Sequence, residues 1–303
     1  MTDPLCPWSL SLARERPDLA IPGSPERCIA RRVVQDADGG LWVLECIDAG
    51  QAARREVLGR LLAGLATAGL TRACAYRPCA GGFVHRDEDG GAWQLAPYGA
   101  GEGLAAPDYT EEDGPGEELA DFLVGLRSAA QLAGAQGGIP AGIDDFFLAP
   151  YVEKLLADMQ RHAPDVHARA AALAARIRPF LDLEPSLPRV LCHGDLHPMN
   201  ALWRQGRILL VIDWEFAGFK HALYDVANTL GCLGIENPRT FSRGAGAAML
   251  RRLEATGLLS SDLAPLLRPA VAAGRFGWLA EWLRKDDAEM VAMELDYLDM
   301  LTR

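Results

Sequence analysis

The sequence predicts an α+β protein with a small, β-rich N-terminal lobe and a larger, mostly helical C-terminal lobe. Short β-prone runs separated by Asp- and Gly-rich turns occur mainly in the first hundred residues, whereas helical periodicity dominates after about residue 115. A glycine-rich stretch at 98–103 offers a flexible connection between the two patterns. We therefore predict lobes at 1–98 and 99–303.

The N-terminal lobe is predicted to contain two pairs of strands with one helix between them. Turn sequences at 36–40 and 87–91 lie inside the two pairs and favour hairpins. Apolar residues recur at helical spacing between the pairs, and Gly69 is suited to end that helix. The expected strands are 27–34, 41–47, 82–85 and 93–97, and the expected helix is 52–68.

The C-terminal lobe is predicted to be helical with one interruption. Two short β-like pieces, V-L-C at 190–192 and I-L-L-V-I at 208–212, break the helical pattern. Each of them delivers polar residues at its end, which makes this the most informative part of the chain. The expected helices are 115–134, 145–161, 164–182, 244–256, 262–284 and 286–301.

The composition argues against several classes of protein. The 303 residues carry 30 basic and 41 acidic side chains, and a net charge of −11 argues against nucleic acid as the main partner. No run approaches the ~20 apolar residues that a membrane-spanning helix needs. The seven cysteines form no C-x-x-C pair, which indicates reduced thiols rather than disulfides or a zinc site. With no secretory leader pattern, we expect a cytoplasmic protein with no membrane partner.

Three oxygen-bearing side chains follow the two β-like pieces. Residues 193–200, H-G-D-L-H-P-M-N, contain Asp195 and Asn200, and Asp213 follows the second piece. Hard cations such as Mg²⁺ prefer carboxylate and amide oxygens, and substrate phosphates often complete their coordination shell. A carboxylate that does not bind the metal is able to orient and deprotonate an attacking hydroxyl. The segment therefore indicates metal-assisted phosphoryl chemistry.

The spacing of these residues is similar to that of protein kinases. Kinases carry H-R-D-L-x-x-x-N, with Asp as base and Asn on the metal, followed by a metal-binding D-F-G. Here the Asp-to-Asn spacing is the same, and I-D-W-E at 212–215 stands in the place of D-F-G. This combination resembles the aminoglycoside phosphotransferase and choline kinase family of the kinase-like superfamily. The resemblance covers the order of elements along nearly the whole chain but is close in residues only over 190–228.

The resemblance implies a bilobal protein-kinase-like fold with an antiparallel N-lobe sheet. It also implies transfer of the γ-phosphoryl group of ATP or GTP to a hydroxyl group of a small molecule, with Mg²⁺ as cofactor. Asp195 corresponds to the catalytic residue, and Asn200 and Asp213 correspond to the metal ligands. His193 is expected to brace the loop, and His197 stands where the family often has a second histidine, with a structural role or a phosphate contact.

Three further residues receive supporting roles from the resemblance. Asp225 resembles a structural aspartate that anchors the helix after it, and a capping role accounts for it without catalysis. Glu56, on the predicted helix 52–68, resembles the glutamate that pairs with a lysine of the sheet; a solvated helix glutamate fits the sequence equally well. Trp214 is expected to pack beneath the metal-binding residues.

The lysine that the resemblance leads us to expect in the N-lobe sheet is absent. Family members place it on the strand that matches 41–47, where this chain has Glu45 followed by Cys46. A carboxylate facing a triphosphate is repulsive, and a low local dielectric strengthens the repulsion. All three lysines of the chain lie outside this lobe.

Three explanations for the missing lysine stay open. Arg31 or Arg32 on the neighbouring strand takes the phosphate role, because a guanidinium suits phosphate; strand alternation lets only one of them face the site. Alternatively, Glu45 points away or pairs with an arginine, while metal and loop backbone hold the phosphates. In the third explanation the chain is a pseudokinase, a nucleotide-binding or regulatory module without efficient transfer.

Four positions are candidates for contacts with the nucleotide on the strength of the resemblance. Residues 22–27 precede the first predicted strand, where backbone N–H groups beside Ser24 would cradle phosphate, although a plain turn explains the sequence equally well. The stretch before the connection between the lobes matches a hinge for the base. Its candidate contacts are Gln94, Ala96 and Tyr98.

The acceptor is not identified by the sequence. Residues 102–121 carry eight acids and no base, and 281–299 carry seven acids against two bases. Such surfaces suit a cationic aminoglycoside-, choline- or homoserine-like acceptor by electrostatic focusing; solvated helix faces explain them as well. Trp278 and Trp282, four residues apart, form either an aromatic wall for an amine or helix packing. ATP is not distinguished from GTP, and the oligomeric state stays unknown.

Overall fold

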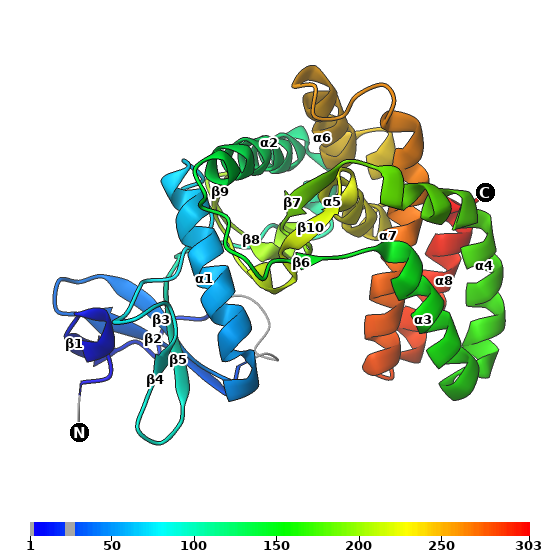
Figure 1. The fold of residues 1–303 in the computed structure, drawn as a ribbon. Helices are drawn as coiled ribbons and strands as arrows, with labels where there is room; N and C mark the ends of the chain where they lie inside the picture. The colour runs from blue at the N-terminus through cyan, green and yellow to red at the C-terminus, as the bar shows by residue number, and fades with distance from the viewer. Residues whose placement is uncertain (1–2, 22–27) are drawn as a thin grey trace. The chain divides into compact units, whose positions relative to one another are not determined.

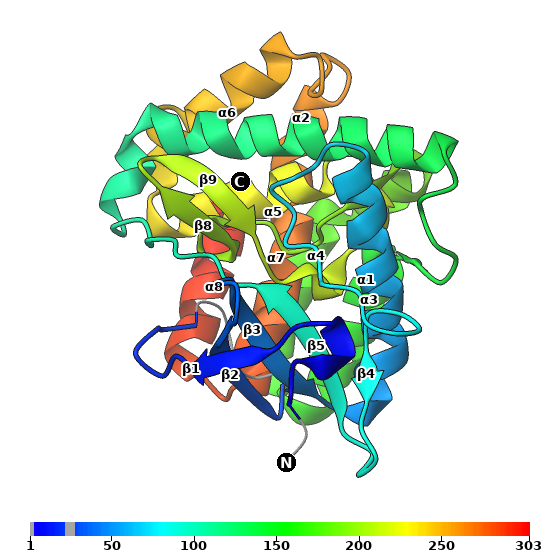
Figure 2. The same cartoon turned by 90° about the vertical axis from the view of Figure 1, so that its left-hand side faces the viewer.

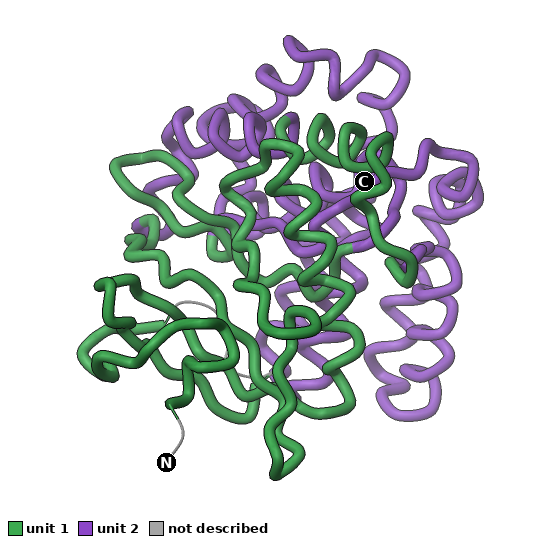
Figure 3. The backbone as a smooth tube through the Cα atoms, turned by 60° about the vertical axis from the view of Figure 1, so that its left-hand side comes forward, with its two compact units in different colours: residues 1–104, 125–143, 199–217 green, residues 105–124, 144–198, 218–303 purple. Residues whose placement is uncertain are grey.

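The computed structural model describes residues 3–21 and 28–303 and confirms the α+β class, with an antiparallel N-terminal sheet and a helical C-terminal region (Figure 1). The chain forms two compact units (Figure 3). Their bounds differ from a simple division at residue 98, because two later segments join the N-terminal part. Unit 1 comprises Met1–Leu104, Gly125–Ile143 and Met199–Ala217, and unit 2 comprises Ala105–Val124, Asp144–Pro198 and Gly218–Arg303.

Unit 1 contains a five-stranded antiparallel sheet with the order β1-β2-β3-β5-β4 (Figure 2). Four of its strands match the predicted positions. The strand β1 was not predicted, because it is short and three of its four residues are exposed, so it carries no alternation of apolar residues. The strands are β1 Leu12–Glu15, β2 Ala30–Asp36, β3 Leu41–Ile47, β4 His85–Arg86 and β5 Ala92–Pro97.

Strand alternation divides the sheet into an apolar face and a face with polar side chains. Leu44 packs with Val34 and Leu95 in a buried cluster on the apolar face. Successive side chains of a strand point to opposite faces, so the neighbour Glu45 lies on the other face. There Glu45 is paired across the strands with Arg31 on β2 and Gln94 on β5.

The turns of the two hairpins repeat the sequence D-x-D-G-G-x-W. In the first turn Asp36 accepts hydrogen bonds from the Gly40 N–H at 2.7 Å and the Trp42 indole N–H at 2.7 Å. In the second, Asp87 accepts from the Gly91 N–H at 2.6 Å and from the Trp93 indole at 2.7 Å. A Cβ atom at either glycine would lie 2.6 Å from that carboxylate, so only glycine fits at these two positions.

Unit 1 also contains α1 Ala52–Thr67 and the hairpin β8 Ala201–Arg204 with β9 Arg207–Val211. Arg54 on α1 donates hydrogen bonds to the backbone oxygens of Glu215 at 3.1 Å and Ala217 at 2.6 Å. The first helix is therefore fixed to the segment that follows β9, although about 160 residues separate them in the chain.

Unit 2 is mostly helical and has a small sheet with the order β6-β10-β7. One helix, α5, was not among the helix ranges predicted from periodicity, although the resemblance implied a helix after Asp225; most of its residues are buried. The strands are β6 Asp144–Asp145, β7 Arg189–Cys192 and β10 Gly218–His221. The helices are α3 Leu148–His162, α4 Pro164–Leu183, α5 Tyr224–Glu236, α6 Gly244–Ala255, α7 Leu267–Arg284 and α8 Ala288–Leu301; α2 Asp113–Ala135 runs from unit 2 into unit 1.

A buried ion pair joins α7 to α8 inside unit 2. The Arg275 guanidinium donates two hydrogen bonds to Glu294, at 2.6 and 2.5 Å, and both side chains are almost fully buried. The two-point geometry compensates for the removal of both charges from water. The Arg275 Cζ atom also lies 5.2 Å from the Trp278 ring centroid, so the guanidinium covers one face of that ring.

Two further properties agree with the composition. All seven cysteines are free thiols. Among the helices that the structure describes, none combines the length and the apolar character required to cross a lipid bilayer.

Candidate active site

Unit 1 contains a pocket that collects side chains from its sheet, from α1 and from the segment after β9. Its walls are partly apolar, with Val43, Ala96 and Leu202 among the lining residues. Five ionisable groups other than cysteine and tyrosine line it as well, three of them acidic. They are Arg31, Glu45, Arg55, Asp213 and Glu215.

Arg55 is the most firmly held charge of the pocket. Its guanidinium forms an ion pair with Glu215 and donates a hydrogen bond to the Tyr76 hydroxyl at 3.2 Å. Only 9% of the Arg55 side chain is exposed. Interactions with Tyr76, Glu215 and Glu45 raise the pKa of Arg55 although its burial opposes the charge, so this side chain stays cationic.

Glu45 occupies the position where the family resemblance leads us to expect a lysine, and its side chain lines the pocket. Burial raises the pKa of Glu45, because removal from water disfavours the carboxylate. The Arg55 and Arg31 guanidinium groups oppose this shift, whereas Glu215 and Asp213 add to it. The carboxylate therefore lines the pocket rather than pointing away from it, and its charge interacts with Arg55 and Arg31, so the explanation in which Glu45 engages an arginine stays open.

Asp213 lines the same pocket and has a left-handed backbone, with φ of 61° and ψ of 59°. This conformation is uncommon for residues other than glycine and asparagine or aspartate. The turn around it is fixed, because the Ile212 N–H donates to the Asn200 carbonyl oxygen at 2.9 Å and the buried Trp214 indole donates to the Val211 oxygen at 2.9 Å. Trp214 therefore packs as expected.

Asn200 and Asp213 fit a divalent cation. Asn200 is buried at the end of the turn Pro198–Asn200, and its backbone is hydrogen-bonded to the residue before Asp213. Both side chains supply oxygen donors, which match the preference of Mg²⁺, and an open pocket beside Asp213 leaves room for phosphate oxygens. The donor set is therefore of the right chemical kind for this ion.

The other predicted residues lie in a loop of unit 2 that follows β7. Asp225, at the start of α5, accepts hydrogen bonds from the backbone N–H groups of His193 at 2.7 Å and Gly194 at 2.8 Å. Gly194 has φ of 89°, which an L side chain rarely adopts. The Asp225 carboxylate thus anchors the loop through the backbone. It does not cap α5 as the sequence predicted, because the residue before this helix is Leu223 and its N-terminus has no side-chain cap hydrogen bond.

The same loop is held a second time by side chains of α5. The Leu196 carbonyl oxygen accepts hydrogen bonds from Asn228 at 3.1 Å and Thr229 at 2.9 Å, and His193 accepts one from the Asp195 N–H at 3.2 Å. Asp195 lies between the two anchored points, and its side chain remains 22% exposed. The loop therefore presents one carboxylate on a fixed backbone.

His197 lies beside this carboxylate and against an aromatic surface. Its Nε2 atom is 3.7 Å from an Asp195 carboxylate oxygen. Its ring meets Trp278 edge-on, with the centroids 5.7 Å apart, and the Trp278 indole N–H donates to the Asn228 side chain at 3.3 Å. Trp282 continues the surface, 5.8 Å from Trp278.

The structure selects one of the two candidate arginines on β2. Arg31 lines the pocket, whereas Arg32 forms an ion pair with Glu15 at 3.0 Å and lies 5.9 Å from the Trp93 ring centroid. The reason is strand alternation, which sends adjacent side chains to opposite faces. Arg32 is therefore not part of the pocket.

Of the remaining predicted nucleotide contacts, two line the pocket and two do not lie in its described lining. Ala96 and Tyr98 line the pocket, and the Tyr98 hydroxyl donates to the Ala20 oxygen at 3.1 Å. Gln94 lies outside the pocket lining, and its amide atoms are buried without a hydrogen-bond partner among the described residues. Ser24 lies outside the described residues.

Glu56 is placed away from the pocket. Its carboxylate accepts hydrogen bonds from the backbone N–H groups of Phe83 at 2.6 Å and Val84 at 3.1 Å, and it pairs with Arg60 at 3.1 Å. On an α-helix, adjacent residues point in directions about 100° apart. The helix therefore turns Arg55 toward the pocket and Glu56 toward the loop before β4.

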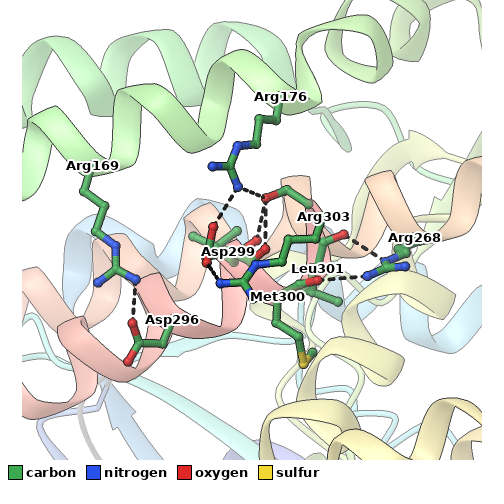
Figure 4. Close-up of polar contacts among 10 residues, drawn as sticks. Arg169, Arg176, Arg268, Asp296, Asp299, Met300, Leu301 and Arg303 are labelled. Atoms are coloured by element: carbon green, nitrogen blue, oxygen red, sulfur yellow. Dashed lines mark hydrogen bonds and ion pairs between the residues drawn. The ribbon is translucent and has the colours of Figure 1, made fainter.

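Seven of the fifteen acids in the two acidic runs form salt bridges with arginine. In the first run, the salt bridges are Glu111–Arg243, Asp113–Arg251 and Asp121–Arg252. In the second, they include Glu281–Arg284, Glu294–Arg275, Asp296–Arg169 and Asp299–Arg176; Figure 4 shows the last two on α8, together with Arg303 beside Asp299 and Arg268 on the final backbone oxygens of the helix. These carboxylates hold helices together, which favours the structural explanation of the acidic runs over an acceptor surface.

Two residues of the pocket, Arg55 and Glu215, were missed by sequence reasoning. They are 160 positions apart, so their ion pair leaves no local signal. The only available clue was the absence of a lysine, which required another cation in the N-terminal region and limited the choice to arginine.

The comparison with known families decides the identity of the fold. Residues 30–266 match the model of the phosphotransferase enzyme family, APH. The chain belongs to this family. The match includes β2, α1, the loop at 193–200 and the segment with Asp213, so the predicted resemblance to this family is confirmed.

Two curated relatives of this phosphotransferase carry the name homoserine kinase. The protein of Gluconacetobacter diazotrophicus is 30% identical over 186 residues, which cover 59% of this chain and 57% of that protein. The protein of Beijerinckia indica subsp. indica is 35% identical over 144 residues, 44% of each chain. The alignments thus span about half the length of the curated relatives.

Solved structures confirm the fold over almost the whole chain. The macrolide 2′-phosphotransferase MphH of Brachybacterium faecium has a TM-score of 0.61 at 20% identity and covers 97% of this chain and 96% of its own. The amicoumacin kinase hAmiN, in complex with AMP-PNP, Ca²⁺ and Ami, has a TM-score of 0.65 at 16% identity over 96% of this chain and 90% of its own. At this identity the likeness concerns the fold.

Proposed function

We propose that this family member transfers the γ-phosphoryl group of ATP or GTP to a hydroxyl group of a small molecule in the cytoplasm. The observation that carries the proposal is the loop of unit 2. Its backbone is fixed by Asp225, and the Asp195 carboxylate stays accessible between two anchored points. This is what a base that must orient an incoming hydroxyl requires.

In the proposed reaction the acceptor oxygen forms a bond to the γ-phosphorus while the bond from that phosphorus to the β-phosphate oxygen breaks. Asp195 orients the hydroxyl and accepts its proton, and ADP or GDP leaves. His193 and His197 support the loop, since one binds its backbone and the other lies beside the carboxylate. The protein therefore acts mainly by positioning and by stabilising charge.

The pocket of unit 1 is the proposed nucleotide site. Ala96 and Tyr98 would border the base, and Arg31 lies on the same pocket. Asn200 and Asp213 would hold Mg²⁺. The ion would neutralise phosphate charge when bound, and the fixed turn at Asp213 would keep that carboxylate in place.

The acceptor that we favour is an amino alcohol of the homoserine type. Two curated relatives are named homoserine kinases. In unit 2, the aromatic surface of Trp278 and Trp282 adjoins His197 and thereby Asp195, and tryptophan faces attract ammonium groups. Since seven of the fifteen acids in the two acidic runs are paired with arginine, the argument for a cationic acceptor rests on the aromatic contacts rather than on surface charge.

The position of Glu45 supports a second candidate function, that of a regulatory module that binds nucleotide. Glu45 lines the proposed phosphate site, where its negative charge opposes a triphosphate. A regulatory module that binds nucleotide without efficient transfer would tolerate this arrangement, whereas an enzyme must compensate for it.

The test is a calorimetric titration of ATP and of GTP with and without Mg²⁺, followed by an assay of nucleoside diphosphate release with homoserine, choline and an aminoglycoside. Binding that depends on Mg²⁺, together with acceptor-dependent release and a phosphorylated product, is the expected result. Binding without release for any acceptor would favour the regulatory module. No binding of either nucleotide would overturn the proposal.

A further inference from the structure

The pocket of unit 1 contains two cations, Arg31 and Arg55, which lie on different elements. Arg31 lies on β2 directly across from Glu45, and its guanidinium reaches the Ile21 oxygen at 3.4 Å, a long contact. Arg55 lies on α1, is 8% exposed, and is fixed by the Glu215 carboxylate and the Tyr76 hydroxyl. A fixed, buried guanidinium loses little conformational freedom when it binds a ligand.

The partner of Arg55 connects it with the proposed metal ligand. Glu215 is two residues from Asp213, and both side chains line the pocket. The turn around them is attached to α1 a second time by Arg54, which binds the backbone oxygens of Glu215 and Ala217. The Arg55 guanidinium is thus held by the same turn that carries Asp213.

Arg55 also has unused hydrogen-bonding capacity. A guanidinium carries five N–H donors, and its hydrogen bonds to described residues use one at each terminal nitrogen, toward Tyr76 and Glu215. The remaining donors suit phosphate oxygens, which guanidinium groups bind by two-point contacts.

The arrangement reverses the polarity that kinases show at these positions. In kinases a lysine of the sheet pairs with a glutamate of the first helix. Here the sheet supplies the carboxylate of Glu45 and the helix supplies the cation of Arg55, and their charges interact across the pocket. In this chain α1 therefore provides the positive charge that the sheet provides in kinases.

We infer that Arg55 supplies the positive charge that binds the nucleotide phosphates in place of the missing lysine, and that Glu215 positions its guanidinium. This inference rests on the proposed phosphotransferase function, because it assumes that the pocket of unit 1 takes a nucleotide. Glu45 then reduces, rather than creates, phosphate affinity. The cation that replaces the missing lysine is thus Arg55 on α1 and not Arg31 on β2.

The experiment compares the affinity for ATP with that for adenosine, which lacks phosphates, by calorimetry in the presence of Mg²⁺. Arg55→Gln is expected to weaken ATP binding about 30-fold or more, as loss of a charge-assisted contact in a partly buried site implies, with adenosine affinity unchanged. Arg31→Gln is expected to weaken ATP binding less than about 3-fold. Arg32→Gln, on the opposite face of the sheet, is the matched control and should bind both ligands as the wild type does.

Two further variants keep the test decisive if Arg55→Gln folds poorly. Arg55→Lys retains a cation, so it should keep adenosine affinity and bind ATP with an affinity between those of wild type and Arg55→Gln. Glu45→Gln removes a repulsive charge and should tighten ATP binding about 3- to 10-fold, in keeping with one charge in a partly screened site. Thermal unfolding of every variant reports whether it is folded.

The outcomes separate the inference from the proposed function. If wild type binds ATP or GTP and Arg55→Gln binds it equally well, or if Arg31→Gln causes the larger loss, Arg55 is not the phosphate ligand and the function stands. Weaker ATP binding by Glu45→Gln would also contradict the inference. If wild type binds no nucleotide, the proposed function itself fails.

Discussion

The pocket of unit 1 contains the half-buried carboxyl group of Glu45, the loop of unit 2 is held by the buried carboxyl group of Asp225, and different partners surround the two. Asp225 accepts two backbone N–H groups and thereby fixes the conformation of a loop. Glu45 faces other charged side chains, two of them cationic and two anionic. The first carboxylate determines geometry, whereas the second adjusts the electrostatic potential of a binding site.

This difference predicts how each region responds to change. A carboxylate that accepts hydrogen bonds from backbone N–H groups is difficult to replace, because its removal leaves buried N–H groups unpaired. A carboxylate surrounded by other charged side chains is easier to replace, because the summed charge of the group determines the electrostatic potential of the site. Substitutions of Asp195 or of its anchor Asp225 should therefore reduce turnover strongly, and substitutions of Glu45 should shift affinity and pH dependence.

The largest effect is expected from Asp195→Asn. The amide keeps the shape of the side chain but is unable to accept the proton, so kcat should fall about 10³-fold or more. ATP affinity and the free energy of unfolding should change little, since the loop anchors remain. The measurement combines steady-state turnover with ATP calorimetry. Loss of ATP binding in this variant would mean that Asp195 serves the metal.

Asp225→Ala should act on stability and activity together. It leaves the N–H groups of His193 and Gly194 unpaired in a buried place, at a cost of about 2–4 kcal/mol. Urea denaturation and turnover are the measurements, and kcat should fall about 10²-fold. Asp225→Asn, which retains one carbonyl oxygen, is the control and should lose less. Unchanged kcat in Asp225→Ala would show that the loop does not depend on this anchor.

The pocket is tested by the pH dependence of Glu45. Since the pKa of Glu45 is raised in the folded state, this group favours folding fully below its ordinary pKa near 4.5, and that contribution is lost as pH rises through the raised value. Glu45→Gln should remove this loss and increase the free energy of unfolding at pH 8 relative to that of the wild type. Chemical denaturation at pH 4.5 and pH 8 is the measurement. A variant less stable than wild type at pH 8 would contradict the raised pKa.

The smallest effect is expected from His197→Phe. Phenylalanine keeps an aromatic ring against Trp278 and removes a nitrogen that lies 3.7 Å from Asp195, too far for a strong hydrogen bond. A drop of kcat of about 3-fold is expected, with unchanged stability. Turnover as a function of pH checks this. A loss of 100-fold would instead assign His197 a direct contact with the transferred phosphoryl group.

The positions of the loop at 193–200 and of the turn at Asp213 could be predicted from sequence because both lie in one short stretch of the chain. Asp195, Asn200 and Asp213 follow short apolar strands at kinase-like spacing, and the strands are where the periodicity places them. Alternation on β2 also predicts that only one of Arg31 and Arg32 faces the pocket. Which of the two does so depends on the register of the sheet, which sequence reasoning left open.

Sequence reasoning did not predict which elements of the pocket carry the cation and which carry the carboxylates, because the residues involved are distant in the chain. The partners Arg55 and Glu215 lie on α1 and after β9, and only the folded chain brings them together. The resemblance directed attention to Glu56, one position away, whose carboxylate is occupied by backbone donors before β4. A shift of one residue on a helix changes the direction of a side chain by about 100°. The family resemblance does not align this helix accurately enough to distinguish Arg55 from Glu56.

The repeated turn D-x-D-G-G-x-W has a consequence for the order in which the sheet folds. Each copy closes a loop of a few residues with an aspartate that binds both the turn backbone and a tryptophan indole. Short loops have low closure entropy and form quickly. The two hairpins should therefore form first and independently, and pairing of β3 with β5, which encloses α1, should be the slower event that joins them into one sheet.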